Sequence, residues 1–221
     1  MAQGRAVVSL AMVRYLLLDL DNTLYSESVG MDNDIARRMN EFVASYLGVG
    51  HDEAREIRRA QRSRFGTTLE WLMSEKGFSD PEIYFAAVHP DGEEYCIEPN
   101  PGLGPLLDSI DLPKAVFTNS PSEHAERVLR KLGVLGRFEA VYDIRFCELK
   151  GKPHAAAFRR VCEACGVGPE DALFVDDMPV YVRGFVELGG RGVVLDEFDR
   201  HLEAGLPRIR SLAELPALLV G

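Results

Sequence analysis

The chain has 221 residues, of which 35 are acidic and 25 are lysine or arginine, so its formal charge at pH 7 is −10. With 46% hydrophobic and 27% charged residues, it has the composition of a soluble globular protein. The acidic balance argues against binding a nucleic-acid polymer or an anionic membrane, because both draw affinity from lysine and arginine contacts with phosphate. A small phosphorylated substrate held at one local site stays compatible with this charge.

The first 11 residues precede the first predicted strand, and we expect them to be a poorly ordered extension rather than a signal peptide. The chain contains no apolar run of the roughly 18 residues that a membrane span needs. Cys162 and Cys165 have the spacing of a redox or zinc pair, but no second pair or histidine cluster completes such a site. Since the pair falls in a predicted helix, we expect both thiols to be structural. These features predict a cytoplasmic protein, and they allow either a monomer or a dimer.

Short apolar runs and helical patterns alternate through most of the chain. Residues 15–19 form an apolar run that ends in an acid, as expected for a central parallel strand covered on both faces. Similar runs lie at residues 114–117, 172–175 and 192–195, with a weaker one at 140–143. Helical patterns separate them at residues 101–109, 122–132, 154–165 and about 180–188. This alternation predicts an α/β fold with a doubly wound, Rossmann-like parallel sheet.

Residues 26–98 interrupt this alternation. They contain no good strand pattern, and amphipathic helical patterns cover residues 32–47 and 52–64. A helical block after the first strand predicts an all-helical cap inserted over the sheet, with residues 12–25 and 99–221 forming the core. Pro99-Asn100-Pro101-Gly102 is the expected return hinge.

The most informative polar residues follow the predicted strands, where ligands bind in open α/β sheets, or precede a predicted helix. They are Asp19, Asp21, Thr118, Asn119, Lys152, Asp176 and Asp177. Four converging carboxylates would repel one another strongly without a cation, which implies a hard divalent ion. Mg²⁺ is the natural candidate, because it accepts a few carboxylates, keeps waters and bridges to phosphate.

In this order along the chain, the motifs resemble those of the haloacid dehalogenase-like (HAD) hydrolase superfamily, and the resemblance extends from Met12 onward. Its four signatures are Asp19-Leu20-Asp21-Asn22-Thr23, Thr118-Asn119-Ser120, Lys152-Pro153 and Asp176-Asp177. Finer features resemble the pyrimidine 5′-nucleotidase-type branch, namely Gly66-Thr67-Thr68-Leu69, Val88-His89-Pro90-Asp91-Gly92 and Phe117-Thr118-Asn119-Ser120. One departure follows the second acid pair, where a frequent Ser or Asn is replaced by Met178-Pro179-Val180.

The resemblance implies a Mg²⁺-dependent phosphatase that works through an aspartyl-phosphate. It implies Asp19 as the nucleophile and Asp21 as the general acid and base. Thr118 and the Asn119 backbone N–H would hold phosphate, and Lys152 would neutralise charge between nucleophile and phosphate. The implied metal ligands are Asp19, Asp21 through its main-chain carbonyl, Asp176 and Asp177.

The cap is expected to close over the site and to set specificity. Thr67, Thr68 and His89 are candidate substrate residues. However, the Thr67-Thr68 pair is also typical of a helix N-cap, and the turn around His89 is typical of a solvated histidine. Trp71 is expected to pack inside the cap, and Arg58 is expected on a solvated helix face.

The favoured substrate is a nucleoside monophosphate or a similar small phosphometabolite. One alternative is a sugar-phosphate or glycolate-phosphate phosphatase, or a mutase, of the same superfamily. Asp21 argues against a dehalogenase, which has no leaving group to protonate. A signalling receiver domain is disfavoured because Lys152 precedes the second acid pair here. A catalytically silent binding or regulatory protein on the same scaffold is the alternative from another class.

Overall fold

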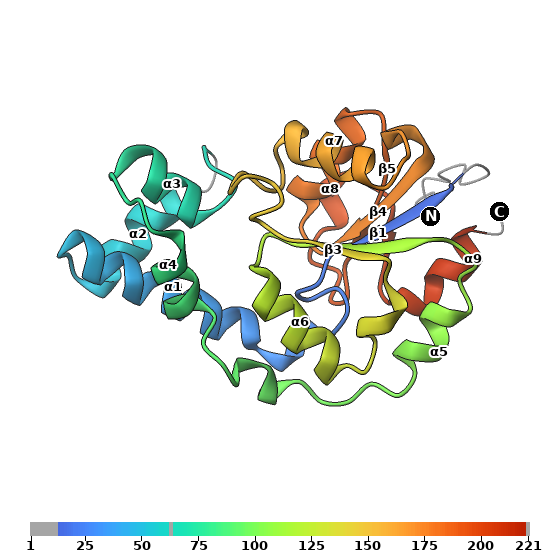
Figure 1. Cartoon of the computed structure of the whole chain (residues 1–221), viewed down its shortest axis with the longest axis horizontal. Helices are drawn as coiled ribbons and strands as arrows, with labels where there is room; N and C mark the ends of the chain where they lie inside the picture. The colour runs from blue at the N-terminus through green and yellow to red at the C-terminus, as the bar shows by residue number, and fades with distance from the viewer. Residues whose placement is uncertain (1–12, 62–63, 220–221) are drawn as a thin grey trace.

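A parallel sheet of six strands forms the centre of the computed structural model, which describes residues 13–61 and 64–219 (Figure 1). The strands are β1 (Tyr15–Leu18), β2 (Lys114–Phe117), β3 (Ala140–Tyr142), β4 (Ala172–Asp176), β5 (Arg191–Leu195) and β6 (Arg208–Ile209). Their order across the sheet is β3-β2-β1-β4-β5-β6, so the winding direction reverses between β1 and β4. Ligands bind at such a reversal in doubly wound sheets. The predicted extension at residues 1–11 lies outside the described residues.

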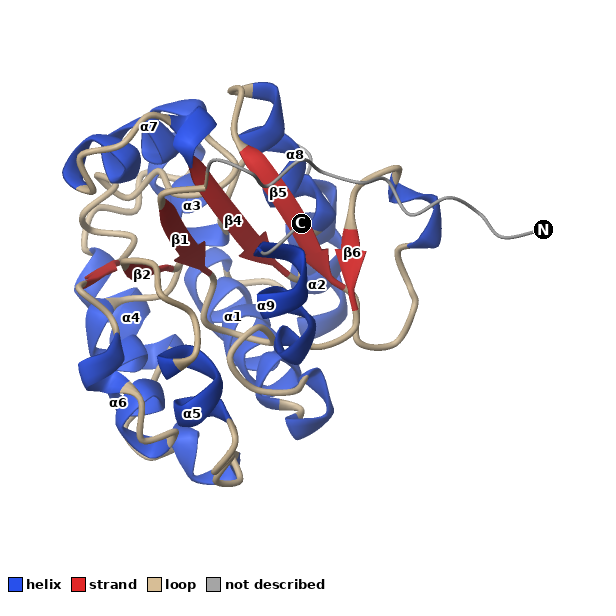
Figure 2. Cartoon of the chain, turned by 90° about the vertical axis from the view of Figure 1, so that its right-hand side faces the viewer, coloured by secondary structure: helices blue, strands red, loops and turns tan. Residues whose placement is uncertain are grey.

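The central strands are buried on both faces, which explains why their sequences are continuous apolar runs. Leu16 and Leu18 of β1 belong to one core cluster, whereas Leu17 belongs to the other. Helices α5 (Leu103–Asp108), α6 (Ser122–Lys131) and α9 (Leu215–Leu219) contribute to the first cluster. Helices α7 (Ala155–Ala164) and α8 (Pro179–Glu187) contribute to the second and cover the other side of the sheet (Figure 2). The doubly wound α/β prediction is therefore confirmed.

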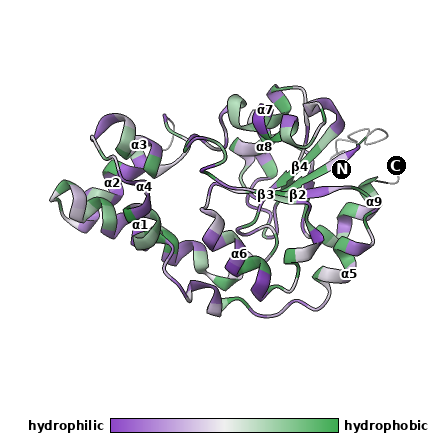
Figure 3. Ribbon diagram, in the orientation of Figure 1, coloured by the Kyte–Doolittle hydropathy of each residue, from purple (hydrophilic) through white to green (hydrophobic). Residues whose placement is uncertain are grey.

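In the described part of residues 26–98, four α-helices follow β1, and they stand beside the sheet in Figure 1. They are α1 (Met31–Leu47), α2 (His51–Gln61), α3 (Thr68–Glu75) and α4 (Pro81–Val88). Hydrophobic and hydrophilic residues mix along each of them (Figure 3), as expected for helices with one buried face. Helix α1 ends at Gly48, whose left-handed backbone (φ 67°) lets its N–H bond the Ala44 carbonyl. Within the described part of residues 26–98 there is no strand, as predicted, while the domain boundaries themselves stay a prediction.

The short elements at the carboxyl end of the chain were not predicted. Strand β6 has two residues and helix α9 has five, which is too short for a clear periodic pattern. Among the described residues, no helix combines the length and the apolar character that crossing a membrane requires. Cys162 is buried in α7 and burial raises the pKa of its thiol to about 12, in keeping with a structural role.

Candidate active site

The carboxyl ends of β1, β2 and β4 meet at one edge of the sheet, and a cavity of about 610 Å³ opens there. The predicted site residues on its wall are Asp19, Asp21, Thr118, Asn119, Lys152 and Asp177. Asp176 lies behind this wall and is fully buried. The structure therefore brings together all seven residues that the sequence singled out, although they come from four separate segments.

Lys152 links two of the acids. Its Nζ donates to Asp19 Oδ1 at 2.5 Å and to Asp176 Oδ2 at 2.6 Å, and only 1% of its side chain is exposed. Burial alone would lower the pKa of Lys152, but the two carboxylates hold it above its ordinary value. A buried ammonium between two carboxylates is stable only because both contacts are made. Lys152 is thus a fixed positive charge beside Asp19.

Asn119 holds Lys152 in place through the backbone. Its Nδ2 donates to the Lys152 carbonyl at 2.9 Å, and the Lys152 N–H donates to its Oδ1 at 2.8 Å. Gly151 permits this approach, because a Cβ there would lie 2.0 Å from Asn119 Oδ1. The side chain of Asn119 is therefore a support for Lys152, while its backbone N–H stays the predicted phosphate contact. Thr118, predicted to bind phosphate, lines the cavity, and its hydroxyl oxygen accepts from the Ser120 N–H at 3.0 Å.

Asp19, Asp176 and Asp177 form a group whose carboxylate oxygens lie within 4.8 Å of one another, so they could hold a metal ion. Three carboxylates and the Lys152 ammonium leave two negative charges uncompensated, which suits a divalent cation. Burial, followed by repulsion from neighbouring acids, raises the pKa of Asp177 to about 9. Beside this group, Asn22 Oδ1 is buried and has no hydrogen-bond partner within residues 13–61 and 64–219. An all-oxygen donor set of this kind fits Mg²⁺ chemistry.

The Asp21 carboxylate has a different set of partners. Tyr25 Oη donates to its Oδ1 at 2.7 Å, and Ser120 Oγ donates to its Oδ2 at 2.9 Å. His124 Nε2 lies 2.7 Å from the same Oδ1. Burial alone would raise the pKa of Asp21, but His124 holds it well below the ordinary value. These three donors occupy the Asp21 carboxylate, and the main-chain carbonyl of Asp21 stays the predicted metal ligand.

The cap residues differ from the expectations in one important case. Thr67 caps α3, because its hydroxyl accepts from the Glu70 N–H at 3.0 Å, and both Thr67 and Thr68 line the cavity. His89 was predicted to be solvated, and this is wrong: it is only 8% exposed, lines the cavity and lies 3.2 Å from Glu93 Oε1. The turn around His89 was predicted from local sequence, whereas its burial results from packing against residues far along the chain.

Two further cap residues can be compared with their predictions. Trp71 is buried in the cap as predicted, with 1% of its surface exposed. Arg58 was expected on a solvated face, but it is half-buried, lines the cavity and donates to Asn40 Oδ1 at 2.7 Å. The sequence of this helix did not distinguish the inward-facing Arg58 from its exposed neighbours Arg55 and Arg59.

The sequence analysis missed His124, Glu93 and Tyr25. His124 Nδ1 lies 2.5 Å from Glu93 Oε1, which connects Glu93 through the imidazole to Asp21. A signal for His124 did exist, since it lies four residues before Val128 on the apolar face of a predicted helix, next to the Thr118-Asn119-Ser120 motif. No comparable local pattern marks Glu93.

Comparison with known proteins agrees with the fold. The family model of haloacid dehalogenase-like hydrolases matches residues 13–189. Phosphate metabolism protein 8 of Saccharomyces cerevisiae is 25% identical over an alignment of 194 residues, which covers 80% of this chain and 59% of that protein. The chain thus spans about three fifths of the length of this relative.

Two solved structures share the fold. A HAD phosphatase from Thermococcus onnurineus is similar with a TM-score of 0.64 and 22% identity, over 95% of this chain and 99% of that chain. L-2-haloacid dehalogenase from Xanthobacter autotrophicus is similar with a TM-score of 0.62 and 17% identity, over the same shares. Since the family model covers most of the residues and the signature motifs converge at one site, the protein belongs to the haloacid dehalogenase-like hydrolases.

Proposed function

We propose that the protein is a Mg²⁺-dependent phosphomonoester hydrolase that works through an aspartyl-phosphate on a small phosphometabolite such as a nucleoside monophosphate. The observation that carries this proposal is the pair Asp19 and Asp21 on one cavity wall, each held by its own partners. A nucleophile and a proton-transfer group side by side are what a two-step phosphoryl transfer needs. The names of the yeast relative and of the Thermococcus phosphatase lend support from outside the chain.

In the first step, an Asp19 carboxylate oxygen forms a bond to phosphorus while the bond from phosphorus to the leaving oxygen breaks. The negative charge of the bound phosphate favours the protonated form of Asp21, and Asp21 gives this proton to that leaving oxygen, so an alcohol departs rather than an alkoxide. Lys152 supplies positive charge to the phosphoryl oxygens. The Thr118-Asn119 segment supplies O–H and N–H donors to them. Lys152 is held beside Asp19 in advance, so little reorganisation is needed when charge develops.

In the second step, water attacks phosphorus and releases Asp19 and inorganic phosphate. Asp21 takes a proton from this water and so recovers the proton that it gave in the first step. Asp19, Asp176 and Asp177 would hold Mg²⁺, and the bound ion would neutralise part of the phosphate charge so that an anionic nucleophile can approach.

The size and lining of the cavity support a leaving group with an apolar body. A volume of about 610 Å³ is within the range of small-molecule sites and is large enough for a phosphate with an attached ring system. Four aromatic side chains of the cap segment line it: Phe65, Trp71, Tyr84 and Phe85. Such a wall suits a flat ring better than a short, fully hydroxylated chain, which favours a nucleoside over glycolate.

The proposal is tested by measuring phosphate release from p-nitrophenyl phosphate and from a panel of nucleoside, sugar and small-acid phosphates with Mg²⁺. We expect Asp19→Asn to abolish turnover in a folded protein, because an amide cannot form the phospho-enzyme. Asp111→Asn, which changes an exposed aspartate in the loop before β2, is the matched control and should keep wild-type activity. Equal activity of the Asp19→Asn variant and the wild type would contradict the nucleophile assignment. A wild type that hydrolyses no phosphate ester would favour the binding-protein alternative.

A further inference from the structure

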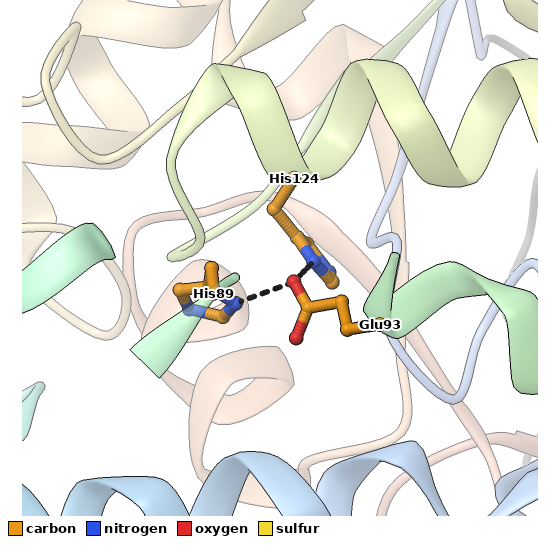
Figure 4. A group of neighbouring side chains, drawn as sticks. All are labelled: His89, Glu93 and His124. Carbon is orange, nitrogen blue, oxygen red and sulfur yellow. Dashed lines mark hydrogen bonds and ion pairs between the residues drawn. The ribbon is translucent and has the colours of Figure 1, made fainter. Parts of the chain in front are cut away.

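A chain of three side chains runs from Asp21 through His124 to Glu93. Figure 4 shows its His124–Glu93 end, with His89 beside Glu93. We propose that His124 and Glu93 are positioning residues that hold the Asp21 carboxylate in the orientation needed for proton transfer. This inference rests on the proposed function, because it concerns the residue to which that function assigns the proton. It adds two residues that neither the sequence motifs nor the family resemblance point to.

The geometry fixes His124 at both ends. Its Nε2 lies 2.7 Å from Asp21 Oδ1 and its Nδ1 lies 2.5 Å from Glu93 Oε1. The side chain of His124 is 0% exposed, so water does not compete for either nitrogen. Rotating the ring by half a turn would break both contacts. The Asp21 carboxylate, which also accepts from Tyr25 and Ser120, is thereby held by donors on both of its oxygens.

Glu93 is itself held from two sides. It pairs with Arg38 on cap helix α1 and with Arg127 on core helix α6, the latter at 3.3 Å. Only 1% of the Glu93 side chain is exposed, and Glu93 begins the short turn that returns the chain from the cap to the core. The orientation of His124, and through it that of Asp21, therefore depends on the contacts that this return segment makes with both the cap and the core.

His89, Glu93 and His124 are also spaced closely enough to hold a metal ion. Two guanidinium groups already neutralise Glu93, so a divalent cation would be repelled there. Both nitrogens of His124 also face carboxylate oxygens, and using either for a metal would release Asp21 or Glu93. The contacts thus favour a hydrogen-bonded chain over a metal site.

The test compares two substrates that differ in their need for an acid. The leaving group of p-nitrophenyl phosphate departs without a proton, whereas an alkyl ester such as glycerol phosphate requires one. We expect Glu93→Gln and His124→Asn to lower kcat/KM for the alkyl ester by on the order of 10- to 100-fold. The same variants should change kcat/KM for p-nitrophenyl phosphate by less than about threefold, because formation of the phospho-enzyme then needs no protonation.

The choice of amide separates positioning from packing. The Nε2 of glutamine can take the place of the imidazole Nε2, so His124→Gln should recover much of the alkyl-ester activity that His124→Asn loses. Glu94→Gln is the matched control, because Glu94 lies 3.4 Å from Arg127 but is not bonded to His124, and it should behave as wild type. Melting temperatures identify any variant that fails to fold. If His124→Asn fails to fold, Glu93→Gln, which keeps the size of the side chain, tests the positioning role.

Equal losses on both substrates in folded Glu93→Gln and His124→Asn, or no loss on either, would overturn the positioning role. A transition metal found in the purified wild type and absent from Glu93→Gln would replace it with a metal site. Failure of the proposed function can be distinguished from failure of the positioning role. In that case, phosphatase activity would not depend on Asp19.

Discussion

The contact between Gly151 and Asn119 allows a quantitative prediction, because adding one methyl group at Gly151 disturbs both the Asn119 side chain and Lys152. In Gly151→Ala the new Cβ would lie 2.0 Å from Asn119 Oδ1 and 2.8 Å from Ile144 Cδ1. Ordinary contact begins near 3.4 Å, so Asn119 would have to withdraw by about 1.4 Å. That movement breaks its two hydrogen bonds with the Lys152 backbone.

The expected cost follows from these contacts. Two lost hydrogen bonds cost about 1 kcal/mol each, and overpacking adds about 1–3 kcal/mol. For a protein of this size, a total of about 3–5 kcal/mol lowers the melting temperature by roughly 10 °C. A displacement of about 1 Å in a catalytic group can cost on the order of 100-fold in rate, so we expect kcat for p-nitrophenyl phosphate to fall by about that factor.

Calorimetry and steady-state kinetics on Gly151→Ala measure the two effects separately. Gly136→Ala is the control, since Gly136 lies in an exposed turn where a Cβ meets nothing within 4 Å. The control should keep the wild-type melting temperature and rate. A Gly151→Ala variant with wild-type stability and activity would refute the claim that Asn119 supports Lys152 through this close contact.

Two further predictions concern charge. Burial alone would raise the pKa of Glu93, but hydrogen bonds from His124 and His89 lower it from 4.5 to about 2, which corresponds to roughly 3 kcal/mol. This stabilisation is fully present above pH 4.5 and is lost as pH falls toward 2. The difference in melting temperature between the wild type and Glu93→Gln should therefore shrink over that range. A constant difference would contradict the stabilisation of ionised Glu93 by His124 and His89. After metal has been removed from the wild type with EDTA, added Mg²⁺ should raise its melting temperature. The increase should be much smaller in Asp177→Asn. Equal increases in the two proteins would exclude Asp177 as a ligand.

The sequence was sufficient to predict the central sheet because buried parallel strands leave a strong signal. Residues 15–19 and 172–175 are continuous apolar runs, and the structure places β1 and β4 there with every residue buried. The core site followed from the same signal, since polar residues directly after such strands must meet at one edge. The two-residue strand β6 leaves no such pattern and was found only in the structure.

The partners of Asp21 could not be predicted in the same way. Glu93 and His124 are 31 residues apart, and His124 and Asp21 are 103 residues apart, so their contacts arise only when the cap return packs on the core. His89 shows the same limit, because its local sequence indicates a turn while its burial depends on that packing. Local sequence patterns indicate which secondary structure forms. The burial of a polar side chain, in contrast, depends on hydrogen-bond partners that are distant in the sequence.

Asp19 and Asp21 are only two residues apart, yet they depend on different parts of the fold. The cation beside Asp19 is Lys152, which the core supplies and which Asn119 holds from the end of β2. The chain behind Asp21 ends on Glu93, which also pairs with a cap helix. On the proposed mechanism, the nucleophile is therefore in place whatever the position of the cap, while the proton-transfer group is in place only when the cap return is seated. This difference would delay cleavage of an alkyl ester until the cavity is closed, and so it would link substrate enclosure to proton transfer.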